Sequence, residues 1–180
     1  MQHLLRLIES LADIFNRMGL RHAFGGALAN NYWGIVRTTQ DVDCLVLIPA
    51  IQHQRLADEL ADQGFVMHDT QGREQPISVA AMREQERERK LIEVHQMGLR
   101  AELFVPFIPL QDEILRRAVP MPLGERTISV TTAEFTPMCT RHTRISRGVT
   151  SSNCSARDWL YFARSNFGNG TRTKYYHPSK

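Results

Sequence analysis

The chain has 180 residues, of which 42% are hydrophobic, enough to bury the core of one domain. No stretch approaches the roughly 18 uninterrupted apolar residues of a membrane-spanning helix, so the sequence predicts no membrane partner. The amphipathic N-terminal segment lacks the apolar core of a signal peptide. Three cysteines without metal-type spacing argue against a disulfide framework, and we expect a reducing, cytoplasmic location.

The formal net charge of +3 is unevenly distributed along the chain. Residues 135–180 hold eight of the 22 Lys and Arg residues but one of the 19 acids, Asp158, so this tail carries +7. The first 134 residues hold the other 14 bases and 18 acids, a balance of −4. The basic character therefore belongs to the tail, and the global charge does not predict a nucleic-acid-binding body.

Hydrophobic periodicity predicts alternating helices and strands in the first half of the chain. Apolar residues at helical spacing predict a helix over 2–18, and Gly19 is suited to end it. The elements expected next are a strand over 21–25, a helix to about Trp33, a buried strand over 41–48 closed by Pro49, a helix over 50–63 stopped by Gly64, and a short strand over 65–67.

A charged run, MREQERERKLIEV, follows and is interpreted as a solvated hairpin or loop flank. Later segments predict strands over 91–96 and 100–107 joined by a Met97–Gly98 turn, a helix over 109–118 and a strand over 127–130. This alternation predicts α/β or α+β architecture for residues 1–134.

The pattern breaks after residue 134. Thr131 and Glu134 have the spacing of a capping box, which announces a helix, but residues 135–180 show no sustained period. Two interpretations stay open for this Ser/Thr-rich segment: a disordered, irregular basic tail, or a shifted reading frame. Its interleaved aromatic and Arg residues also suit stacking on single-stranded nucleic acid.

Two aspartates stand at the start of the predicted buried strand. Alternate side chains of a strand share one face, so Asp41 and Asp43 project together. Such like charges repel, and a divalent cation removes that cost. Magnesium prefers hard oxygen ligands, typically one or two carboxylates together with phosphate oxygens. The pair therefore indicates a magnesium site, although caps for loop N–H groups are the alternative.

A glycine pair lies upstream of the aspartates. Gly25 and Gly26 fall at a predicted strand-to-helix corner, where backbone N–H groups without a neighbouring Cβ approach a phosphate closely. A third carboxylate would complete a two-metal site. Glu102, a single acid in an apolar strand, is the best candidate, and Glu93 is the alternative.

These residues carry a resemblance to a known family. FGGALANNYWGIVRTTQDVDCLV resembles the signature of the nucleotidyltransferase superfamily that includes DNA polymerase beta: a Gly-Gly after a strand, then Asp-hydrophobic-Asp, with a third acid on a later strand. The Arg-x-Thr-x-Asp-hydrophobic-Asp form, here Arg37, Thr39, Asp41 and Asp43, is similar to small stand-alone bacterial members, including abortive-infection-type toxins. The resemblance covers about residues 1–134.

The resemblance implies an α+β fold with a mixed sheet flanked by helices, and transfer of a nucleoside monophosphate from an NTP to an RNA, protein or small-molecule hydroxyl. Asp41, Asp43 and Glu102 would be catalytic and bind magnesium. Gly25, Gly26, Arg37 and Thr39 would bind the nucleotide phosphates. An antitoxin protein is an implied partner. The alternative is a catalytically inactive nucleotide-binding or partner-binding protein of the same fold.

Overall fold

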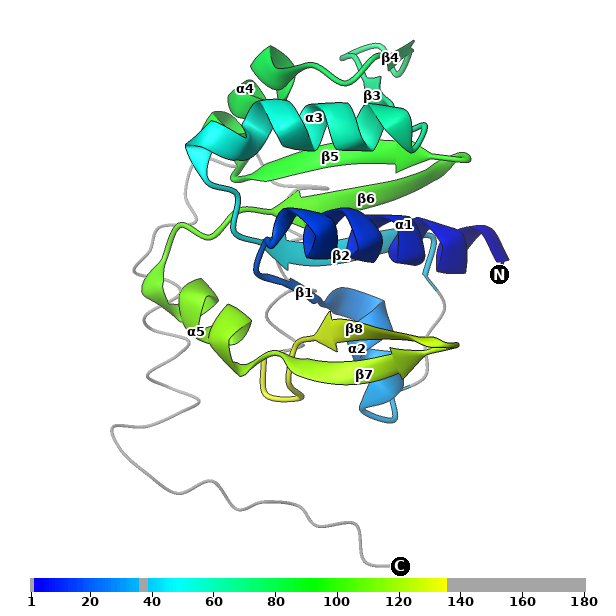
Figure 1. Cartoon of the computed structure of the whole chain (residues 1–180), viewed down its shortest axis with the longest axis vertical. Coiled ribbons are helices and arrows are strands. Elements are labelled where there is room, and N and C mark those ends of the chain that lie inside the picture. The colour runs from blue at the N-terminus through cyan, green and yellow to red at the C-terminus, as the bar shows by residue number, and fades with distance from the viewer. Residues whose placement is uncertain (1, 36–38, 136–180) are drawn as a thin grey trace, which may run out of the picture. The chain divides into compact units, whose positions relative to one another are not determined.

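The computed structural model describes residues 2–35 and 39–135 (Figure 1). The strands of this part of the chain are β1 (His22–Phe24), β2 (Asp41–Val46), β3 (Met67–His68), β4 (Glu74–Gln75), β5 (Leu91–Gln96), β6 (Leu99–Phe104), β7 (Val119–Leu123) and β8 (Arg126–Val130). Six of them form one sheet in the order β5-β6-β2-β1-β8-β7, and β3 pairs with β4. Because β2–β6 and β1–β8 are parallel and the other neighbours antiparallel, the sheet is mixed.

The helices account for the α part of the fold. They are α1 (Gln2–Met18), α2 (Gly26–Tyr32), η1 (Ala50–Gln52), α3 (His53–Asp62), α4 (Val79–Arg89) and α5 (Pro109–Arg117). The predicted α+β fold is thereby confirmed. None of the helices in the described part combines the length and the apolar character needed to cross a membrane.

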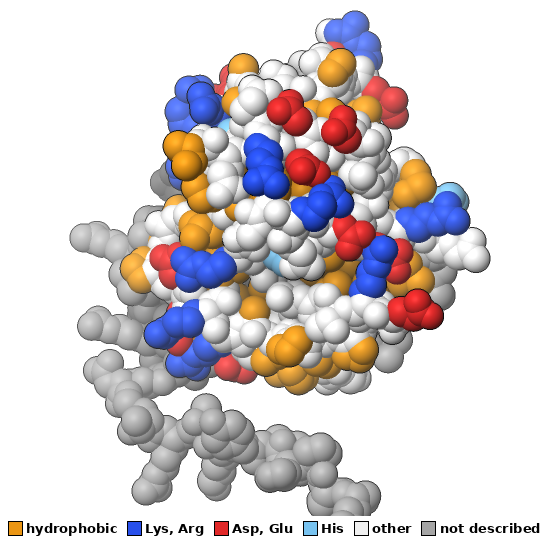
Figure 2. Space-filling model, viewed as in Figure 1, with side chains coloured by type: hydrophobic (Ala, Val, Ile, Leu, Met, Phe, Trp, Pro, Cys, Tyr) orange, Lys and Arg blue, Asp and Glu red, His pale blue; other side chains and the backbone are white. Residues whose placement is uncertain are grey.

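The hydrophobic core between α1 and β2 lies on one face of the sheet. α1 buries Leu7, Leu11 and Phe15 in one cluster with Val42 and Cys44 of β2. Figure 1 shows α1 and α3 in front of the strands. Since side chains alternate along a strand, the face of β2 opposite this core carries its two aspartates. In Figure 2, acidic and basic side chains intermingle on the face that carries α1 and α3.

The charged run was wrongly interpreted as a loop. It lies mostly in α4, which begins after the N-cap Ser78 and ends at Lys90, a residue in the left-handed conformation. Glu, Gln and Arg are good helix formers, but α4 buries Met82 and little else, so it lacks the apolar stripe on which the sequence argument relied.

β7 was not predicted: the expected elements pass from a helix over 109–118 to a strand over 127–130, and β7 contains Pro120 and Pro122. β7 is the last strand of the sheet and pairs antiparallel with β8, and an edge is where prolines are tolerated. The capping-box residues form a turn closed by the bond from Phe135 N to Thr132 O, 3.0 Å. Both interpretations of the tail stay open, since residues 136–180 lie outside the described part.

Candidate active site

The parallel pairing of β2 and β6 brings the predicted carboxylates together. Asp41 lies opposite Arg100, and Asp43 lies opposite Glu102. Directly paired residues of neighbouring strands project from the same face of a sheet, so all four side chains share one face. Asp43 is 7% exposed and Glu102 is 2% exposed. Two carboxylates are thus buried next to each other, a costly arrangement unless a cation compensates their charge.

The alternative third acid lies on the same face. Glu93 of β5 is the antiparallel partner of Glu102. Its carboxylate accepts from Arg89 at 3.3 Å and contacts Nε2 of His95 at 3.0 Å. Burial acts to raise the pKa of Glu93, but His95, Arg89 and Arg100 outweigh it and lower that pKa below its ordinary value. Glu93 is therefore held by Arg89 and His95, and it lies on β5, one strand further from β2 than Glu102 on β6, which favours Glu102 as the third acid.

The glycine pair lies directly against Asp43. The N–H of Gly25 donates to the backbone carbonyl of Asp43 at 2.9 Å. Gly26 has a φ of +56°, and a Cβ added there would overlap Oδ2 of Asp43 and lie 2.8 Å from its Cγ. Glycine is required here both by the left-handed backbone and by the close approach of the carboxylate. The helix that follows, α2, has only seven residues, so the backbone of the corner itself is the relevant surface.

Thr39 is engaged with Asp41. Its hydroxyl lies 2.7 Å from Oδ1 and 2.8 Å from the backbone oxygen of Asp41, and it accepts from the Asp41 N–H at 3.3 Å. This local network orients the Asp41 carboxylate at the start of β2. The predicted contact of Thr39 with a phosphate stays a prediction. Arg37, the other residue predicted to contact phosphate, lies outside the described residues.

Arg100 is a member of the site that the sequence argument missed. Its Nη2 donates to Oδ2 of Asp41 at 2.8 Å and lies 3.4 Å from Oε1 of Glu102. Burial acts to lower the pKa of Arg100, but Asp41, Glu102 and Glu93 outweigh it and raise that pKa. The available signal was its position two residues before Glu102, which places both side chains on one face of a strand.

The donor set fits a divalent cation in its chemistry. Carboxylate oxygens are hard ligands of the kind that magnesium prefers, and two of them face each other across β2 and β6. The three acids are not drawn into one preformed cluster: over residues 2–35 and 39–135, no three His, Cys, Asp or Glu side chains are grouped as metal ligands. Asp41 is instead held by Thr39 and Arg100.

Comparison with solved structures identifies the architecture. A candidate nucleotidyltransferase (TM1012) from Thermotoga maritima aligns with 89% of this chain and 94% of its own, at 12% identity and a TM-score of 0.52. The chain has a nucleotidyltransferase fold. A tRNA-processing enzyme in an apo form matches 75% of this chain and 31% of its own, at 23% identity and a TM-score of 0.36. No family model and no curated protein matches the sequence.

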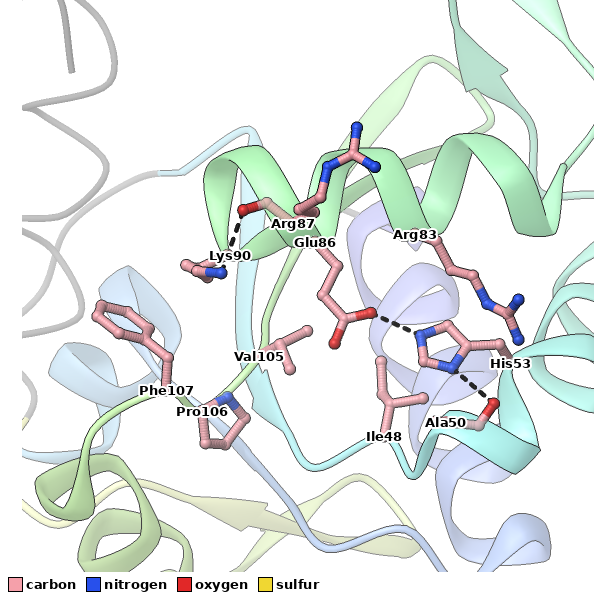
Figure 3. Close-up of a pocket in the computed structure, with 10 residues that line it drawn as sticks. All are labelled: Ile48, Ala50, His53, Arg83, Glu86, Arg87, Lys90, Val105, Pro106 and Phe107. Atoms are coloured by element: carbon pink, nitrogen blue, oxygen red, sulfur yellow. Dashed lines mark hydrogen bonds and ion pairs between the residues drawn. The ribbon is translucent and has the colours of Figure 1, made fainter. Parts of the chain in front are cut away.

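A separate cavity of about 410 Å³ opens beyond the other end of β2 and β6 (Figure 3). Ile48 and Val105 form part of its wall, and none of the predicted site residues lines it. Figure 3 shows Glu86 of α4 directed at His53 of α3. His53 is 2% exposed; its Nε2 lies 2.7 Å from Glu86 Oε2 and its Nδ1 lies 3.2 Å from the Ala50 carbonyl oxygen. The pair joins α3 to α4.

Replacing Glu86 is expected to weaken the junction of these two helices. Glu86→Ala leaves buried His53 without its carboxylate, and losing the partner of a buried polar group costs about 1–3 kcal/mol of unfolding free energy. The control Glu88→Ala removes an exposed carboxylate of the same helix, 3.6 Å from Arg87, and should change stability by less than about 0.5 kcal/mol. Urea denaturation measures both, and equal losses would contradict the structural role of the pair.

Proposed function

We propose that the chain is a magnesium-dependent nucleotidyltransferase that moves a nucleoside monophosphate from an NTP to a hydroxyl group. The observation that carries the proposal is the pairing of Asp43 with Glu102 on one face of the sheet, against the Gly25–Gly26 corner. The fold shared with the Thermotoga maritima protein supports it. The acceptor of the nucleoside monophosphate is a hydroxyl group of RNA, of a protein or of a small molecule.

In this proposal the chain's residues bind and orient the reactants. Asp41, Asp43 and Glu102 hold the metal, and the Gly25–Gly26 backbone contacts the triphosphate. When bound, magnesium neutralises charge on the phosphate oxygens and on the leaving pyrophosphate. A bond forms between the acceptor oxygen and the α-phosphorus while the bond from that phosphorus to the pyrophosphate oxygen breaks. The acceptor proton leaves to a base, for which Glu102 is the candidate.

Transfer of label from nucleotides tests this function. The full chain is supplied with each α-³²P-labelled NTP, Mg²⁺ or Mn²⁺, and total cell RNA or protein, and pyrophosphate release is measured in parallel. We expect metal-dependent release together with labelled acceptor. Metal-dependent ATP binding without any release would favour the alternative, an inactive nucleotide-binding or partner-binding protein of this fold.

The finer biological role extends the proposal. The Arg-x-Thr-x-Asp-hydrophobic-Asp motif of the chain resembles that of abortive-infection-type toxins, and this resemblance favours a cytoplasmic toxin controlled by an antitoxin protein. Induced expression of the chain should then arrest growth of a bacterial host, and the Asp41→Ala, Asp43→Ala double variant should not. Equal growth of both strains would argue against a toxin while leaving nucleotidyl transfer to be judged by the label assay.

A further inference from the structure

Arg100 occupies the position between two of the proposed metal ligands. One atom, Nη2, lies 2.8 Å from Oδ2 of Asp41 and 3.4 Å from Oε1 of Glu102. Parallel pairing fixes this arrangement, since Arg100 is the direct partner of Asp41 and stands two residues before Glu102 on β6. The guanidinium thus contacts carboxylates of two different strands from the face that they share.

The guanidinium offsets the repulsion among the acids of this face. Asp41, Glu102 and Glu93 all act electrostatically on Arg100, so one positive charge serves several carboxylates. Arginine does not lose its proton in proteins, so it cannot give way to a metal by becoming neutral. Its side chain has to move if another cation is to take the same oxygens.

A divalent cation and Arg100 make incompatible demands on these two carboxylates. Magnesium takes ligand oxygens at about 2.0–2.1 Å, and a guanidinium within hydrogen-bond distance of the same oxygens would meet it with like charge. The Arg100 side chain is 27% exposed and long, whereas that of Glu102 is 3% exposed. Arg100 is therefore the partner able to swing away while the carboxylate stays.

We propose that Arg100 is a built-in counter-ion that holds Asp41 and Glu102 in the metal-free protein and must be displaced when a divalent cation binds. This inference rests on the proposed function. It assigns Arg100 a regulatory role: competition with the guanidinium weakens metal binding and sets the metal concentration at which the site fills. Removing Arg100 should therefore tighten metal binding while destabilising the metal-free state.

Metal affinity tests the competition without any catalytic readout. Mn²⁺ is titrated by calorimetry into the full-length wild type, Arg100→Gln and Arg89→Gln, with no nucleotide present. Arg100→Gln should bind Mn²⁺ about tenfold more tightly than the wild type, because the competing charge is gone. Arg89→Gln is the matched control: Arg89 pairs with Glu93 nearby, and its loss should change the Kd less than about twofold.

The outcomes separate this inference from the proposed function. Equal or weaker Mn²⁺ binding by Arg100→Gln, with clear binding by the wild type, overturns the competition and leaves the metal site standing. No Mn²⁺ binding by either protein overturns both. An equal gain in Mn²⁺ affinity in Arg89→Gln also overturns the inference, because loss of any nearby positive charge would then explain the tighter binding.

Thermal unfolding gives the second readout. In EDTA, Arg100→Gln should melt below the wild type, since its carboxylates have lost their counter-ion, and excess Mn²⁺ should raise its Tm by more than it raises that of the wild type. If Arg100→Gln does not fold, Arg100→Lys replaces it in the test, because lysine keeps the positive charge but not the forked donor. The Mn²⁺ affinity of Arg100→Lys should lie near that of the wild type. A smaller Mn²⁺-induced rise in Arg100→Gln than in the wild type overturns the inference.

Discussion

Replacing both aspartates of β2, Asp41→Ala together with Asp43→Ala, is expected to abolish magnesium-dependent ATP binding and nucleotidyl transfer while leaving the fold intact. The double variant removes two of the three proposed metal ligands, both of which lie on the shared face of the sheet. A metal ion supplies several kcal/mol of transition-state stabilisation, so transfer should fall by about 10³-fold or more. Calorimetric titration of ATP with and without Mg²⁺ measures binding, and α-label transfer measures activity.

The control for this variant changes the net charge of the protein by the same amount. Asp58→Ala with Asp62→Ala removes two exposed carboxylates from α3 and should leave ATP binding and transfer unchanged. Circular dichroism checks the fold of both double variants. Equal Mg²⁺-dependent ATP affinity in the wild type and the β2 variant would count decisively against the proposed site.

Adding one methyl group at the glycine corner, Gly26→Ala, should destabilise the protein and displace Asp43. The φ of +56° is unfavourable for an L-residue, and the new Cβ would overlap the Asp43 carboxylate. The left-handed backbone costs about 1–2 kcal/mol and the overlap about 1–3 kcal/mol, so the free energy of unfolding should fall by about 2–5 kcal/mol. Urea denaturation measures the loss.

Gly19→Ala isolates the backbone contribution. Gly19 has a φ of +66°, and nothing lies within 4 Å of a Cβ added there. This control should lose about 1–2 kcal/mol of unfolding free energy, and its nucleotidyl transfer should be unchanged. If Gly26→Ala lost no more than Gly19→Ala and kept full activity, the close packing of Asp43 on the corner would be disproved.

Local sequence signals were sufficient where one element carries the information. The apolar spacing of α1 and the left-handed Gly19 that follows it gave correct bounds, and the alternation in LIEVHQ predicted β5. The glycine corner and the two aspartates were found in the same way, because all four lie within 19 residues of the chain. Short-range geometry, the repeat of a helix or strand, governs each of these features.

Features that depend on tertiary partners escaped the sequence argument. α4 is a helix without an apolar stripe, and β7 is a strand that contains prolines because it stands at an edge. Arg100 was not singled out, because its contact with Asp41 depends on the pairing of β2 with β6, and only Glu102 lies on its own strand. Which of Glu93 and Glu102 faces Asp43 was likewise undecidable before the strand order was known.

The parallel alignment of β2 with β6 has a consequence for synthesis of the chain on the ribosome. A nascent polypeptide that has emerged as far as β5 already contains the glycine corner and both aspartates, but Glu102 has yet to follow. A shift of one residue in the alignment would turn Glu102 toward the hydrophobic interior. Under the proposed chemistry, a polypeptide that ends before β6 should therefore be inert, and activity should arise only after β6 has paired with β2 in the correct register.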